Sequence, residues 1–451
     1  MFWIELIIVL AIIFIGVRVG GTFLAMAGGI GMFIMTFILH VTPSDPPITV
    51  ILIMIAVICA AATMQACGGL DYLVRIAEKI LRKNPKMITV LAPVVAYIFT
   101  FMCGTGHIVY SLLPVINEIA IETGVRPERP ISASIVSSQQ AITACPISAA
   151  TVGILAFMAA ATVGILAFMA EATNYTKVNI FTLLIVCVPA TLIGTVIAAI
   201  AVIKKGKELA DDPEFQARVE AGLIEDFSKK VKEEKKVSKE AKISVTIFLI
   251  AMVGIVLLGA VSGLVPTLAD GSKLPLTTVI EIFMLVAAAA MILLTKLDSN
   301  KVLDQPVFRT GMFAVVLAFG LCWLVNTFIG DQSSFITDNM SALTNKYPWI
   351  FIVAVFIVGA ITTSQSSTTM IMIPIGIALG LPANVIVAGW IACSSNYFIP
   401  ASGQCVAALA FDSAGTTKIG KFVLNHSYMI PGLVCTVVSV VVALLIGAVV
   451  F

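Results

Sequence analysis

The stretch 101–146 of this chain reads FMCGTGHIVYSLLPVINEIAIETGVRPERPISASIVSSQQAITACP. It places the polar break GTGH at 104–107 between two short apolar segments, and a run of serine and glutamine before Pro146. Lipid cannot satisfy free backbone groups, so a broken helix survives in a membrane only where protein buries it or where it lines a wet cavity. Transporters build substrate sites from such breaks near the bilayer midplane. The stretch therefore predicts a binding site made of interrupted helices.

The composition indicates a membrane protein. Of the 451 residues, 59% are hydrophobic and 12% are charged, and the mean hydropathy is +1.07, whereas a soluble domain carries about 25% charged residues. The net charge of +2 gives no basic surface that would favour nucleic acid. The nine cysteines form no CxxC pair or His/Cys cluster, so we expect buried core residues and no metal site. The apolar N-terminus lacks the features of a cleaved signal peptide and is expected to be a retained helix.

Hydropathy predicts ten membrane spans and two short hairpins, given that a span needs about 20 apolar residues. The first half offers spans at 3–19, 22–40, 48–66 and 179–203, hairpin limbs at 87–103 and 108–123, and an interrupted helix at 131–170. The second half offers spans at 243–264, 277–297, 310–330 and 425–451, limbs at 349–363 and 370–381, and an interrupted helix at 383–411.

Basic residues concentrate in alternate loops, which orients the spans. Most of the basic residues lie in three loops, 68–86, 298–309 and 412–424, and in the stretch 204–242. This pattern predicts that these segments are cytoplasmic and that both termini lie outside. The stretch 204–242 mixes both charge signs at high density, so we expect a solvated helical linker between two halves.

The two halves enter the membrane from opposite sides, which predicts an inverted repeat. Residues 1–203 form the first repeat, with a hairpin tip at 103–107 that enters from the cytoplasm. Residues 243–451 form the second, with a tip at 364–368 that enters from outside. The predicted fold is an all-α polytopic membrane protein with two inverted repeats. Each has five transmembrane helices, one of them interrupted, and a re-entrant hairpin. The segment AATVGILAFMA occurs twice, at 149–159 and 160–170, and is given no functional role.

The polar breaks have groups that suit a small dianion. Two desolvated carboxylates need donors in place of water, and helix N-termini with neutral hydroxyls and amides supply them. We expect one carboxylate at the first-half breaks and the other at the second-half breaks. The candidate binding residues are Gly104, Thr105, Gly106, His107, Ser137, Ser138, Gln139, Ser364, Gln365, Ser366, Ser367, Thr368, Ser394, Ser395 and Asn396.

The sequence leaves the roles of four ionisable side chains open. His107 could carry a transported proton, donate to the substrate or serve the structure. Glu281 lies early in an apolar span, where it is either functional or solvated at an interface. Arg126 and Arg129 follow the first hairpin, where they are expected to anchor the topology at the cytoplasmic surface or to attract anions.

Five stretches resemble a known family: GGLDYLV at 68–74, LRKNPKMITVLAP at 81–93, CGTGHIVYSLLPVI at 103–116, RPERPISAS at 126–134 and FDSAGTTKIGKFVLNHSYMIPG at 411–432. With these motifs the chain resembles the DcuA/DcuB branch of the Dcu family of anaerobic four-carbon dicarboxylate transporters over nearly its whole length. It departs from the family's pattern in the duplication and at 398–404, where FIPASGQ replaces an ILPTYP-like run.

The resemblance implies a secondary transporter of the bacterial inner membrane. It would exchange fumarate, malate or aspartate for succinate during anaerobic growth, without a cofactor and without enzyme activity. The resemblance also implies the architecture of the elevator-type ion-transporter superfamily and a homodimer, and it allows a sensor kinase as a partner. The alternative is a dicarboxylate symporter coupled to Na⁺ or H⁺, because the sequence excludes neither ion. An intramembrane enzyme is disfavoured, since the chain has no HExxH motif and no nucleophile elbow.

Overall fold

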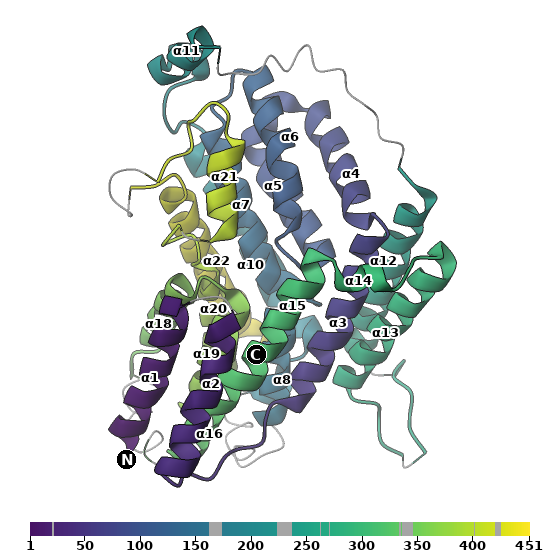
Figure 1. Ribbon diagram of the computed structural model, residues 1–451, viewed down its shortest axis with the longest axis vertical. Helices are drawn as coiled ribbons and strands as arrows, with labels where there is room; N and C mark the ends of the chain where they lie inside the picture. The colour runs from purple at the N-terminus through teal and green to yellow at the C-terminus, as the bar shows by residue number, and fades with distance from the viewer. Residues whose placement is uncertain are drawn as a thin grey trace.

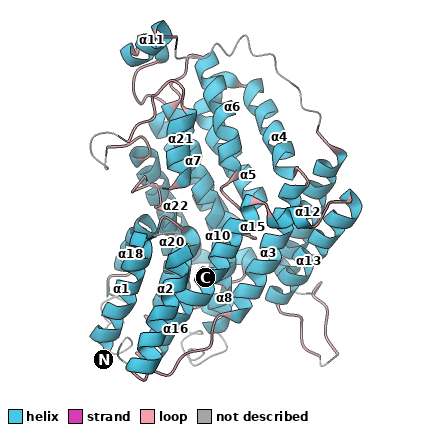
Figure 2. Cartoon of the chain, in the orientation of Figure 1, coloured by secondary structure: helices cyan, strands magenta, loops and turns pink. Residues whose placement is uncertain are grey.

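The chain is an all-α polytopic membrane protein (Figure 2). This computed structural model describes residues 1–19, 22–161, 174–222, 237–261, 263–269, 271–332, 335, 346–400, 402–419 and 425–451. Within these residues, eight helices have the length and composition to cross a membrane, and shorter apolar helices accompany them. The predicted fold class is confirmed at this level.

One set of helices, here called the outer group, comes from the start of each half of the chain. Its first-half members are α1 (Phe2–Val19), α2 (Thr22–Phe33), which continues as the π-helical turn η1 (Ile34–Ile38), and α3 (Ile48–Ala66). Its second-half members are α12 (Lys239–Ala260), α13 (Leu276–Thr295), α15 (Pro306–Leu317), the π-helical turn η6 (Ala318–Cys322) and α16 (Trp323–Asp331). α3 packs against α13 and α15, and α2 packs against η6 (Figure 1).

The remaining long helices form the hairpin group. In the first half these are α5 (Ile88–Cys103) and α6 (Ile108–Glu122), which form the first hairpin, then the broken helix α7 (Glu128–Ala144) and α8 (Ala149–Ala161), and α10 (Ile180–Val202). In the second half they are α18 (Trp349–Thr362) and α19 (Gln365–Ala378), which form the second hairpin, then α20 (Ala383–Ile391), η7 (Ala392–Ser394) and α21 (Gly403–Phe411), and α22 (Met429–Val450). Each half thus supplies a hairpin, a broken helix and a final span in the same order.

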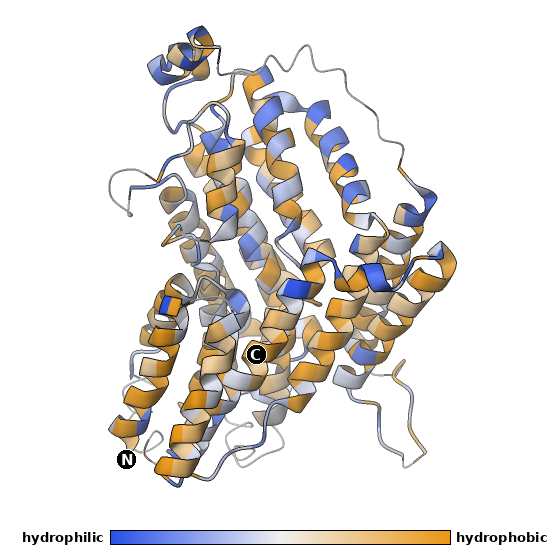
Figure 3. Cartoon of the chain, in the orientation of Figure 1, coloured by the Kyte–Doolittle hydropathy of each residue, from blue (hydrophilic) through white to orange (hydrophobic). Residues whose placement is uncertain are grey.

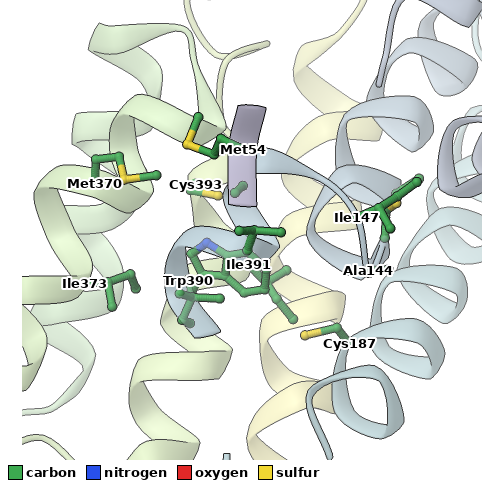
Figure 4. Close-up of a cluster of buried hydrophobic side chains, with 14 of the residues drawn as sticks. Met54, Ala144, Ile147, Cys187, Met370, Ile373, Trp390, Ile391 and Cys393 are labelled. Carbon is green, nitrogen blue, oxygen red and sulfur yellow. The ribbon is translucent and has the colours of Figure 1, made fainter. Parts of the chain in front are cut away.

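Small residues allow α10 and α22 to pack closely within the hairpin group. A Cβ added at Gly194 of α10 would lie 2.1 Å from Ser439 Oγ and 2.7 Å from the carbonyl oxygen of Cys435 on α22. Without a hydrophobic force between helices in lipid, such close backbone approach is what holds membrane helices together. Buried side chains from other elements fill the neighbouring core, among them Met370 and Trp390 (Figure 4).

Several predicted boundaries differ from the structure for local reasons. The return limb of the second hairpin begins at Gln365 rather than 370, because Ser364 Oγ accepts the N–H of Ser367 at 3.2 Å and starts the helix before the apolar run. The predicted tip 364–368 is therefore mostly the first turn of α19. The basic loop 68–86 contains the amphipathic helix α4 (Gly69–Lys83).

Within the described residues, a helix break lies inside each of the predicted segments 131–170 and 383–411. The first starts earlier than predicted, at Glu128, and breaks between α7 and α8. Most of the second copy of the duplicated segment, 162–170, lies outside the described residues.

Arg126 and Arg129 are part of an ion-pair network, whose partners the sequence did not predict. Arg126 is bonded to Asp212 and, at 2.8 Å, to Glu128. Arg129 is 4% exposed and holds Glu208 at 2.6 Å. Burial alone would raise the pKa of Asp212, but hydrogen bonds from the linker backbone and the charge of Arg126 hold that pKa below its ordinary value.

The same network contacts the start of the 204–242 linker, most of whose described residues are exposed. Lys205 Nζ lies 2.9 Å from Glu128 Oε1, and Arg129 Nε donates to the carbonyl oxygen of Lys205 at 2.7 Å. The helix α11 (Pro213–Glu220) follows, and Arg218 at its end donates to the carbonyl oxygen of Ser413 at 3.0 Å. The first part of the linker is therefore docked on the hairpin group, and 223–236 lies outside the described residues.

Candidate functional site

A cavity of about 740 Å³ lies between the hairpin group and the outer group. Residues of both hairpin tips line it, and so do residues at both helix breaks. The opposite wall comes from α2, α3 and α15. All four interruptions of the hairpin group therefore meet at one cavity.

The hairpins turn at this cavity through left-handed backbone. Gly104 ends α5 with φ +70°, and Thr363 ends α18 with φ +51°. The N–H of Gly104 donates to the carbonyl oxygen of Thr100 at 2.9 Å, and that of Thr363 to the carbonyl oxygen of Gly359 at 3.0 Å. These bonds satisfy part of each helix C-terminus, and the next helices begin at Ile108 and Gln365.

Four helices begin at the cavity, and side-chain oxygens shape their first turns. Ser148, Ser364 and Ser402 precede α8, α19 and α21, and the Oγ of each accepts the N–H three residues further on, at 3.2, 3.2 and 3.4 Å. At the first tip, Thr105 Oγ1 accepts the N–H of His107 at 3.3 Å. Each serine is an N-cap, which satisfies one of the N–H groups that a helix start leaves without an acceptor.

The remaining N–H groups of these helix starts suit an anion. A helix N-terminus carries roughly half a positive charge and presents free donors. The cavity is lined by the first residues of α8, α19 and α21 and by the tip that leads into α6. Two of these starts come from each half of the chain. A ligand with an anionic group at each end would find donors from both halves.

Gln404 joins the two halves beside the cavity. Its Nε2 donates to the carbonyl oxygen of Gly106 at 2.8 Å, and its Oε1 accepts from Gln139 Nε2 at 3.0 Å. A Cβ added at Gly106 would lie 2.2 Å from Gln404 Nε2, so glycine allows this contact. Gln365 Nε2 donates to the carbonyl oxygen of Gln139 at 3.2 Å. One chain of hydrogen bonds thus connects the first tip, both broken helices and the second hairpin.

Nine of the fifteen predicted site residues line the cavity: Gly104, Thr105, Gly106, His107, Ser364, Gln365, Ser366, Ser367 and Asn396. The other six are buried behind it: Ser137, Ser138, Gln139, Thr368, Ser394 and Ser395. The sequence therefore located the cavity, but it did not separate the side chains that face it from those that support it.

The supporting residues are engaged with protein groups. Ser137 Oγ donates to the carbonyl oxygen of Pro93 at 2.6 Å, and Ser138 Oγ lies 2.8 Å from Thr100 Oγ1. Ser395 Oγ donates to the carbonyl oxygen of Phe356 at 2.6 Å. Such bonds fix the breaks against the first limb of each hairpin, and they leave these hydroxyls less able to hold a ligand.

Two residues that line the cavity have buried polar atoms that no described residue bonds. Ser367 is fully buried and Asn396 is 5% exposed. Ser367 Oγ and Asn396 Oδ1 have no hydrogen-bond partner in the described part of the chain. An unpaired buried polar group costs about 1–3 kcal/mol. A polar ligand in the cavity would offset this cost.

Sequence reasoning missed three kinds of residue. Ser148 and Gln404 were not predicted. Ser148 directly precedes the apolar run of α8, and a serine in that position is a recognisable N-cap signal. Tyr110 lines the cavity, and its ring stacks on that of His107 with centroids 5.8 Å apart. Arg309 of α15 also lines the cavity. Glu281 lies on α13 and is not part of the lining.

The charges around the cavity favour an anion. No Asp or Glu occurs among the described residues that line it, whereas Arg309 does. Nor do the described residues include a group of three His, Cys, Asp or Glu side chains that could hold a metal ion. A polytopic membrane fold with such a cavity between two groups of helices defines a membrane carrier for a small anionic solute.

The family follows from sequence comparison. The model of the DcuA/DcuB family, described as anaerobic C4-dicarboxylate membrane transporters, matches residues 1–451. The chain therefore belongs to this family of transporters, and the family resemblance that the motifs indicated is confirmed.

Curated relatives match over nearly their whole length. The anaerobic C4-dicarboxylate transporter DcuB of Escherichia coli O6:H1 is 37% identical over 444 residues, which cover 98% of this chain and 97% of DcuB. The C4-dicarboxylate transporter DcuA of Escherichia coli K12 is 37% identical over 446 residues, or 99% of each chain. DcuA of Wolinella succinogenes is 36% identical over 98% of each chain.

Solved structures show a similar fold at low identity. The Alcanivorax borkumensis YdaH transporter gives a TM-score of 0.58 at 15% identity, covering 93% of this chain and 88% of that one. Neisseria gonorrhoeae MtrF gives a TM-score of 0.54 at 13% identity, covering 93% and 84%. These similarities concern the fold alone.

Proposed function

We propose that this carrier exchanges four-carbon dicarboxylates across the bacterial inner membrane during anaerobic growth. It takes in fumarate, malate or aspartate and releases succinate. The observation that supports this most strongly is the cavity at which helix N-termini from both halves meet without a lining carboxylate in the described chain. Family membership and the names of the relatives support the same substrate class.

The two carboxylates of the substrate are held by different halves. One lies at the first tip, near Thr105 and the start of α6. The other lies near Ser366, Ser367 and Asn396, at the start of α19 and the second break. A four-carbon dianion is short, so this mode needs the two sets of donors on facing walls of one small cavity, and all of these residues line the same cavity. Ser137 and Ser138 serve as supports in this proposal, because their hydroxyls bond Pro93 and Thr100.

Transport follows from movement of the hairpin group against the outer group, as in an elevator. Residues 1–203 and 243–451 are inverted repeats joined by 204–242, and each supplies outer helices, a hairpin, a broken helix and a final span in the same order. The substrate cavity lies between the two groups. A shift of one group along the other would therefore change the side from which the cavity is open.

The basic loops are cytoplasmic and both termini are outside in this account. The end of the molecule that carries α4 and α11 is rich in hydrophilic residues, and the N-terminus lies at the opposite end (Figure 3). The variant Lys207→Cys should react with a membrane-impermeant maleimide only from the cytoplasmic side, and Ser272→Cys only from outside. Eight of the nine native cysteines are buried, so background labelling should be low. Labelling from the reverse sides would overturn the assigned orientation.

Counterflow in proteoliposomes tests the proposed exchange. Vesicles loaded with succinate should accumulate labelled fumarate or aspartate, and empty vesicles should not. A symporter is the alternative, because the ends of α5 and α18 bring residues such as Cys103 and Thr362 to the cavity and backbone carbonyls at helix ends can hold a cation. Uptake into empty vesicles driven by a Na⁺ or pH gradient would favour the symporter over the exchanger.

A further inference from the structure

The outer wall of the cavity is mostly apolar but carries one cation. Residues of α3 such as Met54, Val57 and Ile58 line this wall. At the start of α15 the wall becomes polar, with Arg309 and Thr310. Among the described residues that line the cavity, Arg309 is the only arginine or lysine. The cation belongs to the outer group and not to the hairpins that carry the other predicted binding groups.

Arg309 is not committed to a strong ion pair. Its guanidinium lies 3.9 Å from Asp304 Oδ1, and the two side chains are 72% and 77% exposed. An exposed pair at this distance contributes little. Arg126 and Arg129 differ, since each holds a carboxylate at 2.8 Å or less. The positive charge of Arg309 is therefore available to a ligand.

The position of Arg309 gives that charge a place along the transport path. It lies on the first turn of α15, three residues after Pro306, and its backbone N–H donates to the carbonyl oxygen of Gln305 at 3.2 Å. The proposed orientation puts this helix start at the cytoplasmic side. The side chain is thus exposed at that side and still borders the cavity that holds the hairpin tips.

We propose that Arg309 attracts the dicarboxylate into the cavity from the cytoplasmic side only. Because it sits on the outer group, movement of the hairpin group carries the tips away from it. Substrate that enters from outside then reaches the tips without its help. This inference rests on the proposed exchange of dicarboxylates and adds a specific, one-sided role to it.

The expected effect is a change in apparent affinity on one face. A unit charge about 8 Å from a dianion in water changes occupancy about fivefold, and more where protein lowers the dielectric constant. Arg309→Gln should therefore raise the KM for succinate from the cytoplasmic face about five- to tenfold, with kcat changed by less than about twofold. The KM from the outer face should stay unchanged. Arg309→Lys should keep most of the wild-type affinity, because it keeps the charge.

Exchange measured from each face tests the proposal. Right-side-out and inside-out membrane vesicles give the KM of labelled succinate for the outer and the cytoplasmic face, at low and at high salt. Wild-type KM at the cytoplasmic face should rise with salt, and Arg309→Gln should lose most of that rise. Lys301→Gln is the matched control, since Lys301 is an exposed cation on the short helix α14 (Asn300–Leu303) and does not line the cavity.

Each outcome separates this inference from the proposed function. The proposed role of Arg309 would be overturned if Arg309→Gln raised the KM equally at both faces or at neither face. It would also be overturned if Lys301→Gln raised the cytoplasmic KM by the same factor. Failure of the wild type to exchange succinate at all would instead overturn the proposed function. Fluorescence-detected size-exclusion profiles of the variants, which should match the wild type for this exposed residue, exclude misfolding as the cause.

Discussion

Asn396→Ala is expected to weaken succinate binding about 10- to 150-fold. Asn396 lines the cavity at the second break, and no hydrogen bond within the described part of the chain occupies the N–H donors of its side-chain amide. Its amide is therefore available to the substrate, and a hydrogen bond to a charged group contributes about 1.5–3 kcal/mol, which is the stated factor in affinity. The loss should appear in a titration of the purified carrier with succinate.

A neighbouring asparagine provides the control for Asn396. Asn384→Ala removes the same amide from α20, the helix that leads into this break, but at a position that does not line the cavity. Its succinate affinity should stay within about twofold of the wild type.

Butyrate, which has one carboxylate, should bind poorly to the wild type because one half of the site stays empty. Native succinate affinity in folded Asn396→Ala would show that this break is only structural.

Gly28→Val is expected to abolish the folded protein. A Cβ at Gly28 of α2 would lie 2.2 Å from the carbonyl carbon of Gly320 and 2.5 Å from the backbone nitrogen of Leu321, both in η6. Gly320 approaches equally closely, since a Cβ there would lie 2.0 Å from the carbonyl oxygen of Ala25. Overpacking costs about 1–3 kcal/mol even where side chains can adjust, and here only backbone could move.

The adjacent glycine provides a matched control for Gly28. A Cβ at Gly29 meets nothing within 4 Å, and the residue is exposed. Gly29→Val should therefore give a monodisperse size-exclusion peak and a wild-type melting temperature in detergent, whereas Gly28→Val should give aggregate or no peak. A well-folded Gly28→Val protein would mean that the contact between α2 and η6 is not as close as the structure shows.

The positions of the breaks could be predicted because their residues act locally. Glycine at 104 and serine at 364 determine where a helix ends or begins through their own backbone and side chain. Apolar length and the alternation of basic loops gave the spans in the same way. These signals lie within a few residues of the feature that they predict, so a single sequence contains them.

The partners of individual polar side chains could not be predicted, because they depend on distant segments. Ser137 and Ser138 look like ligand donors in the sequence, yet both turn towards α5. Gln404 bonds Gly106, which is 298 positions away in the chain. Arg129 donates to Glu208, a linker residue 79 positions away. The tertiary packing within each half and between the halves decides which polar groups face the cavity.

A structure determined with bound succinate tests the central claim most directly. The account predicts density for succinate in the cavity between the two hairpin tips, with one carboxylate near Thr105 and the start of α6 and the other near Ser367 and Asn396. Density at another place, or a succinate held by residues of one half alone, would contradict the claim that both halves share the two charges of the substrate.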